Sequence, residues 1–64
     1  MKVRDVIERL EDDGWALARW KGDHRQFKHP TKPGHVTVAG HRNTDVPVGT
    51  LRNIWKQAGL LRDD

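Results

Sequence analysis

A chain of 64 residues with a net charge of +3 has room for one small domain, which we expect to span residues 1–64. The absence of cysteine excludes a disulfide framework, a cysteine-based zinc site and a thiolate nucleophile. The longest unbroken apolar stretch, residues 15–18, is far shorter than the roughly 20 residues of a membrane span, and the first residues do not lead into the apolar region of a signal peptide. We therefore expect a cytoplasmic protein that does not enter a membrane.

The first predicted element is an amphipathic helix close to the N-terminus. Gly14 follows its last turn and can take the left-handed conformation that ends a helix. Arg9 and Asp13 are four residues apart, so we expect them to pair on the exposed side of this helix. The apolar residues that recur at i, i+3, i+4 and i+7 are Val3, Val6, Ile7 and Leu10.

Three short strands separated by turns are predicted next. Phe27 is the only apolar residue of the second strand, whereas the third strand is rich in β-branched residues. Residues 21–23 favour a turn, and residues 30–34 form the clearest turn because two prolines and a glycine prevent a strand from continuing. The predicted strands are residues 15–20, 24–29 and 35–38.

A second amphipathic helix follows the polar loop at residues 40–45, and Gly59 ends it. Its apolar residues are Leu51, Ile54, Trp55 and Ala58. Two such helices and a three-stranded antiparallel sheet bury one another only if both helices pack on the same face of the sheet. The sequence therefore predicts an α+β fold of order α-β-β-β-α, with its tryptophans in the core and the other sheet face open.

Positive charge is concentrated in residues 19–42. This segment holds six basic residues and one acidic residue, a balance of +5, while the rest of the chain carries six basic and eight acidic residues, a balance of −2. All four histidines also lie in the segment. Such an uneven distribution is expected when one surface of a protein meets a polyanion.

His24 is the candidate for chemistry on the open face. Side chains alternate along a strand, so if Phe27 points into the core, His24 and Lys28 point the other way. Imidazole transfers protons near neutral pH, and RNA carries its own nucleophile in the 2′-hydroxyl, which DNA lacks. One histidine with nearby cations can supply most of what RNA cleavage needs. The spacing alone leaves open a simple phosphate contact.

A zinc site built from the histidines is not expected. Their spacings of five, six and six residues match no common zinc motif. Strand alternation also places His24 and His29 on opposite faces of the sheet. We therefore expect no metal and no other cofactor.

Two segments of the chain resemble the HicA (YcfA-like) toxin family. Residues 22–30 read Gly-x-His-x-x-Phe-x-His-Pro, and residues 47–59 read Pro-x-Gly-Thr-Leu-x-x-Ile-x-x-Gln-Ala-Gly. The resemblance runs from about residue 3 to residue 61. It implies a double-stranded-RNA-binding-domain-like fold and the toxin of a type II toxin–antitoxin system. Such a toxin is an mRNA interferase that cuts RNA without a metal and arrests translation and growth. It also implies a HicB-type antitoxin that masks the active site.

The resemblance also implies roles for individual residues. The catalytic histidine of the family matches His24, and the second family-typical histidine, His29, is expected to brace the end of its strand. Asp23 stands where serine or threonine is common, and its negative charge opposes the approach of phosphate. With His24 as general acid and base, the residues expected to bind RNA phosphates are Lys21, Arg25, Lys28 and Lys32. Alternation, however, sends Arg25 to the side of Phe27.

Two other functions stay open at this point. The first is a non-catalytic module that binds double-stranded RNA. Such modules usually carry a lysine cluster at the start of the last helix, where Arg52 is the only nearby cation here. The second is a protein-interaction partner whose basic face meets an acidic protein.

Overall fold

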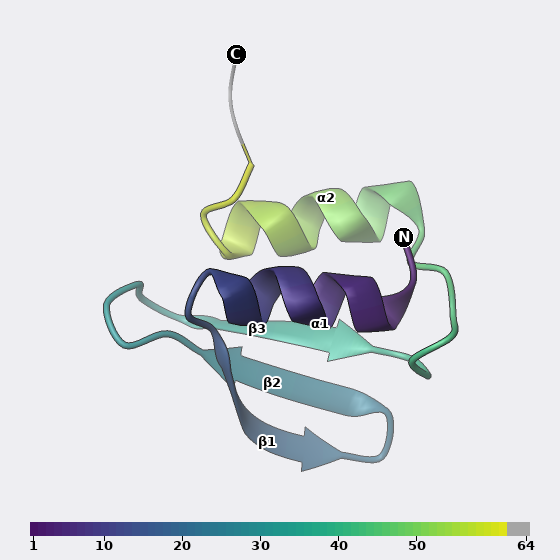
Figure 1. Cartoon of the computed structure of the whole chain (residues 1–64), viewed down its shortest axis with the longest axis horizontal. Coiled ribbons are helices and arrows are strands. Elements are labelled where there is room, and N and C mark those ends of the chain that lie inside the picture. Colours follow the sequence, from purple (N-terminus) through teal and green to yellow (C-terminus); the bar gives the residue numbers. More distant parts are fainter. Residues whose placement is uncertain (62–64) are drawn as a thin grey trace.

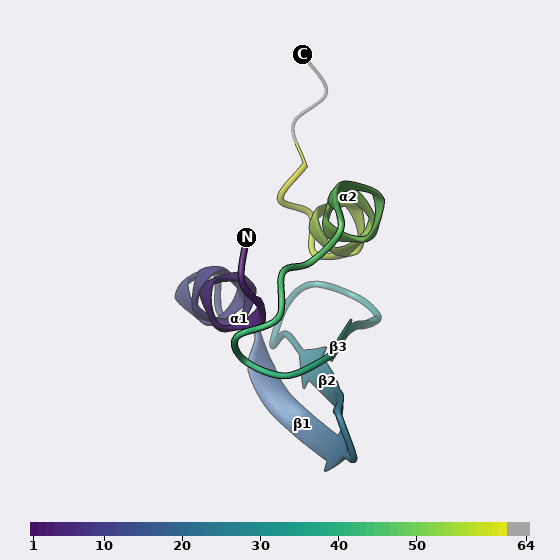
Figure 2. The ribbon, with the colours of Figure 1, turned by 90° about the vertical axis from the view of Figure 1, so that its right-hand side faces the viewer.

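The computed structural model describes residues 1–61, which form five elements in the predicted order α-β-β-β-α (Figure 1). The strands pair antiparallel in the order β1-β2-β3. Both helices lie on one face of this sheet, as predicted, and they run side by side (Figures 1 and 2). The elements are α1 (Val3–Asp12), β1 (Ala16–Lys21), β2 (His24–Lys28), β3 (His35–Ala39) and α2 (Val48–Gln57).

The core lies between the two helices and the sheet face that they cover, which we call the helix-covered face. Phe27 of β2 and Val36 and Val38 of β3 point into it, because alternate residues of a strand share a face. The apolar positions of α1 predicted from their helical spacing pack against them. The buried residues of the core are Val3, Val6, Leu10, Trp15, Phe27, Val36, Val38, Val46, Ile54 and Ala58.

Glycines with positive φ end both helices. Gly14 follows α1 with a φ of 104°. Gly59 follows α2 with a φ of 70°. Its N–H donates to the carbonyl of Lys56, and the N–H of Leu60 donates to the carbonyl of Trp55 at 2.8 Å. These two bonds are the pattern of a Schellman motif, which satisfies carbonyls that the end of a helix leaves unpaired.

An irregularity in β1 changes which side chains share a face with β2. Leu17 pairs with Phe27, but the next pair is Arg19 with Gln26, so Ala18 is an extra residue in the strand. Such a β-bulge reverses the alternation that follows it. Arg19 and Lys21 therefore lie on the sheet face opposite the helices, which we call the open face.

Trp20 contradicts the prediction that the tryptophans are core residues. It is 61% exposed, because β1 is an edge strand and extends beyond the cover of the helices (Figure 2). Its indole Nε1–H donates to the carbonyl of Gly22 at 2.8 Å. The guanidinium of Arg25 lies 4.9 Å from its ring centre. Trp20 is therefore an exposed side chain held in place by polar contacts.

Candidate functional site

A depression with a volume of about 450 Å³ lies on the open face, where the β1–β2 turn meets the strands. Gly22 begins this two-residue turn with a φ of 61°, the positive value that a type II′ hairpin requires at that position. The residues that line the depression come from all three strands and the turn. They are Arg19, Lys21, Gly22, Asp23, His24, Gln26 and Thr37.

His24 lies at the turn end of β2, paired with Lys21 of β1 and Ala39 of β3. Its side chain is 65% exposed, and its Nδ1 lies 3.0 Å from the Oδ1 of Asp23. The Nε2 atom has no hydrogen-bond partner among residues 1–61. His24 therefore offers one free ring nitrogen to a ligand in the depression, in agreement with the alternation read from the sequence.

Cations flank His24 on the open face. Arg19 and Lys21 line the same depression, and both follow the bulge that turns them to this side. Lys28 is exposed at the other end of β2, where it pairs with His35. It lies four positions along the strand from His24, a distance on the order of 13 Å. Arg19 is not among the residues that the sequence predicts to bind RNA, because no pattern in the sequence indicates the extra residue in β1.

Arg25 does not lie on the open face, where it would have to lie to contact RNA beside His24. It is 8% exposed, and its Nη1 donates to the backbone carbonyl of Gly40 at 2.8 Å. Its partner in β1 is Trp20, on the helix-covered side. This placement corrects the expected phosphate contact: Arg25 ties β2 to the end of β3.

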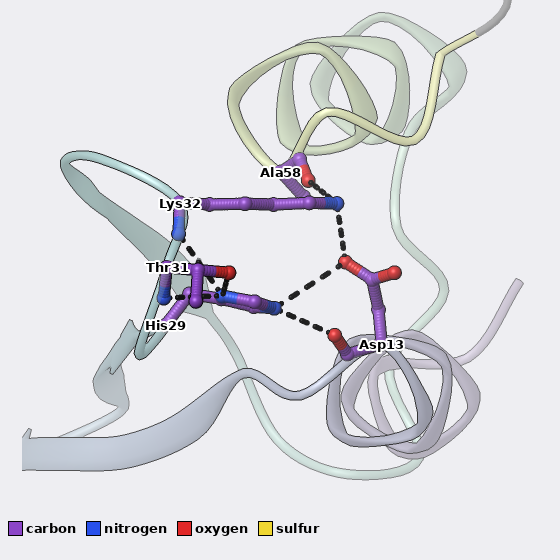
Figure 3. Close-up of polar contacts among 5 residues, drawn as sticks. All are labelled: Asp13, His29, Thr31, Lys32 and Ala58. Atoms are coloured by element: carbon purple, nitrogen blue, oxygen red, sulfur yellow. Dashed lines mark hydrogen bonds and ion pairs between the residues drawn. The ribbon is translucent and has the colours of Figure 1, made fainter.

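Lys32 is half-buried in the loop after β2 and contacts the ends of the helices rather than the open face (Figure 3). Its Nζ donates to the Oδ2 of Asp13 at 2.5 Å and to the carbonyl of Ala58 at 3.0 Å. The hydrogen bond and the positive charge of Lys32 lower the pKa of Asp13 below its ordinary value. Lys32 is therefore paired on the side of the helices and not beside His24, so its expected phosphate contact stays a prediction. Asp13 pairs with Lys32 instead of Arg9.

His29 braces the loop that follows β2 (Figure 3). Its Nδ1 accepts hydrogen bonds from the backbone N–H groups of Thr31 and Lys32, both at 3.1 Å. Nδ1 is thus unprotonated, so Nε2 carries the hydrogen and donates to the carbonyl of Asp13 at 2.7 Å. The side chain is 9% exposed. His29 is a structural histidine, and both of its ring nitrogens form hydrogen bonds within the protein.

The part of the chain that the structure describes offers no candidate metal site. Residues 1–61 contain no group of three histidine, cysteine or acidic side chains arranged to hold an ion. None of the helices in this part has the length and hydrophobicity needed to cross a membrane.

The sequence matches one protein family along most of its length. The family model is described as HicA toxin of bacterial toxin-antitoxin, and it matches residues 3–60. No curated protein matches the chain. The matched range includes every strand and both helices.

Proposed function

Because the chain belongs to the HicA family of bacterial toxins, we propose that it acts by cleaving mRNA, with His24 as its general acid and base. A toxin of such a system has an antitoxin partner, and we propose that this partner is of the HicB type and covers the open face. The observation that supports the proposal best is the free Nε2 of His24 inside a depression lined by Arg19 and Lys21.

The chemistry follows from what RNA itself supplies. His24 Nε2 takes the proton of a 2′-hydroxyl, the 2′-oxygen attacks the adjacent phosphorus, and the bond from phosphorus to the 5′-oxygen breaks. The imidazolium of His24 then returns this proton to the departing 5′-oxygen through a water molecule, and the other product carries a 2′,3′-cyclic phosphate. Substrates with a 2′-deoxyribose at the cleavage site have no nucleophile and stay intact.

The cations stabilise the charge that builds up on the phosphate. Arg19 presents a planar guanidinium that can bind two phosphate oxygens at once, and Lys21 adds a second positive charge at the mouth of the turn. Lys28 binds a phosphate further along the strand, because it lies at the opposite end of β2. Positive groups fixed beside the reacting phosphate lower the barrier without reorganising during the reaction.

A pair of single-histidine variants tests this function. Wild type, His24→Ala and His35→Ala are expressed in a bacterium, and growth and mRNA integrity are followed. His35 is the matched control: its side chain is exposed like that of His24, but it lies on β3 and outside the depression. We expect wild type and His35→Ala to degrade mRNA and stop growth, and His24→Ala to do neither.

Two results would contradict the catalytic assignment. One is intact mRNA in cells that express wild type, and the other is equal degradation by His24→Ala. A non-catalytic module for double-stranded RNA predicts instead that His24→Ala changes little and that RNA duplexes bind with an affinity that falls steeply with salt.

A further inference from the structure

Asp23 lies directly beside the proposed catalytic histidine, in the turn between β1 and β2. Its Oδ1 is 3.0 Å from the Nδ1 of His24. The backbone carbonyl of Asp23 accepts a hydrogen bond from the N–H of Gly40 at 3.0 Å, which ties the turn to the end of β3. The carboxylate is therefore carried by a turn that connects β1 to β2 and is also tied to the end of β3.

The charge of Asp23 works against RNA binding. It is the one acidic residue in residues 19–42, and it lines the depression together with Arg19 and Lys21. A carboxylate in that position repels the phosphates that the two cations attract. On the grounds of binding alone, a neutral residue at position 23 would serve better.

The same charge favours the proton transfer. When Nε2 of His24 accepts a proton, the imidazole becomes positively charged on a ring whose Nδ1 faces the carboxylate. A negative charge at this distance stabilises the imidazolium, and it also favours the ring orientation that leaves Nε2 free for the 2′-hydroxyl. The two effects of Asp23, on binding and on the chemical step, therefore have opposite signs.

We propose that Asp23 is a positioning residue for His24, which raises the rate of the chemical step at the cost of weaker RNA binding. The proposal rests on RNA cleavage by His24 as proposed above. The two side chains are 54% and 65% exposed, so water screens their interaction. An exposed ion pair of this kind changes a rate by roughly two- to fivefold.

Steady-state cleavage of a short RNA by the purified chain tests the proposal. We compare wild type with Asp23→Asn, which keeps the shape of the side chain, and with Asp23→Ser, which keeps a side-chain hydrogen bond in the turn. Glu8→Gln is the matched control, because it removes one negative charge from an exposed position on α1, on the other side of the sheet. Thermal unfolding of each variant is recorded in parallel.

We expect kcat to fall about two- to fivefold in both Asp23 variants while KM also falls, with unchanged unfolding temperatures. Glu8→Gln should change neither constant by as much. A kcat that is unchanged or higher in the Asp23 variants overturns the proposal and leaves the proposed function standing. A kcat loss that accompanies a lower unfolding temperature in both variants assigns Asp23 a structural role and also overturns it. If wild type shows no His24-dependent cleavage, the proposed function fails, and this proposal fails with it.

Discussion

The ammonium group of Lys32 lies 2.5 Å from the Oδ2 of Asp13 and joins the loop after β2 to the end of α1. The same ammonium group donates to the carbonyl of Ala58 just after α2, so one side chain connects both helices to the sheet (Figure 3). Together with His29, this cluster holds the helix layer in place behind the sheet. It therefore stabilises the scaffold on which the open face is built.

The stability of the protein should depend on pH through Asp13. Lys32 holds the pKa of Asp13 below its ordinary value of 3.8, chiefly through its hydrogen bond. A carboxylate with a lowered pKa in the folded state stabilises the fold fully above its unfolded value, and this contribution is lost as the pH falls through the folded value. In urea unfolding, Asp13→Asn should therefore be less stable than wild type at neutral pH, and the difference should shrink once the pH falls below 3.8. An equal difference at neutral and strongly acidic pH would contradict this.

Replacing His29 should destabilise the fold, whereas replacing His24 should not. His29→Ala leaves the N–H groups of Thr31 and Lys32 and the carbonyl of Asp13 without their partner. We expect a loss of about 2–3 kcal/mol in the free energy of unfolding. His24→Ala should change it by at most about 0.5 kcal/mol, because the side chain is exposed. Urea unfolding of the two variants measures both values, and similar losses would refute the division into a structural and a functional histidine.

Gly14 should tolerate alanine far less well than Gly49. Gly14 has a φ of 104°, and a Cβ there would lie 2.8 Å from the Nε2 of His29. Both the strained backbone and the disturbed histidine should reduce stability, by at least about 1 kcal/mol. Gly49 has no atom within 4 Å of an added Cβ and lies in α2, so Gly49→Ala should stabilise the protein by roughly 0.5–1 kcal/mol. Thermal or urea unfolding distinguishes the two, and a neutral Gly14→Ala would show that the contact with His29 does not constrain this site.

Substitution of Arg19 should weaken RNA binding, whereas substitution of Arg25 should reduce the stability of the fold. In a His24→Ala background, which keeps the RNA intact, Arg19→Gln should weaken RNA binding and lower the salt dependence of the affinity by about one phosphate contact. Arg25→Gln should leave that salt dependence unchanged. Instead it should cost about 1–3 kcal/mol of folding free energy, because the carbonyl of Gly40 loses its partner. Filter-binding titrations over a range of salt concentrations, with urea unfolding beside them, test both. Equal RNA binding by His24→Ala with and without Arg19→Gln would show that Arg19 does not contact the RNA.

Local patterns in the sequence determined much of the fold. The helical spacing of Val3, Val6 and Leu10 predicted the buried side of α1, and the burial of these three residues confirms it. The prediction was possible because a helix repeats about every 3.6 residues whatever surrounds it. The glycines at positions 14 and 59 end the two helices, as predicted. The alternation around Phe27 placed His24 on the open face for the same reason, since the period of a strand is a local property.

Only the tertiary structure decided which charged side chains accompany His24. Ala18 is extra in β1 relative to β2, and this mismatch between two strands turned Arg19 toward His24. Lys32 is paired with Asp13, and Arg25 with the carbonyl of Gly40, across 19 and 15 residues of sequence respectively. Trp20 is exposed because β1 extends beyond the part of the sheet that the helices cover (Figure 2). Helix and strand periods are determined within a few neighbouring residues, whereas strand register, edge exposure and long-range pairing depend on how separate elements meet, so no single segment of this sequence contains them.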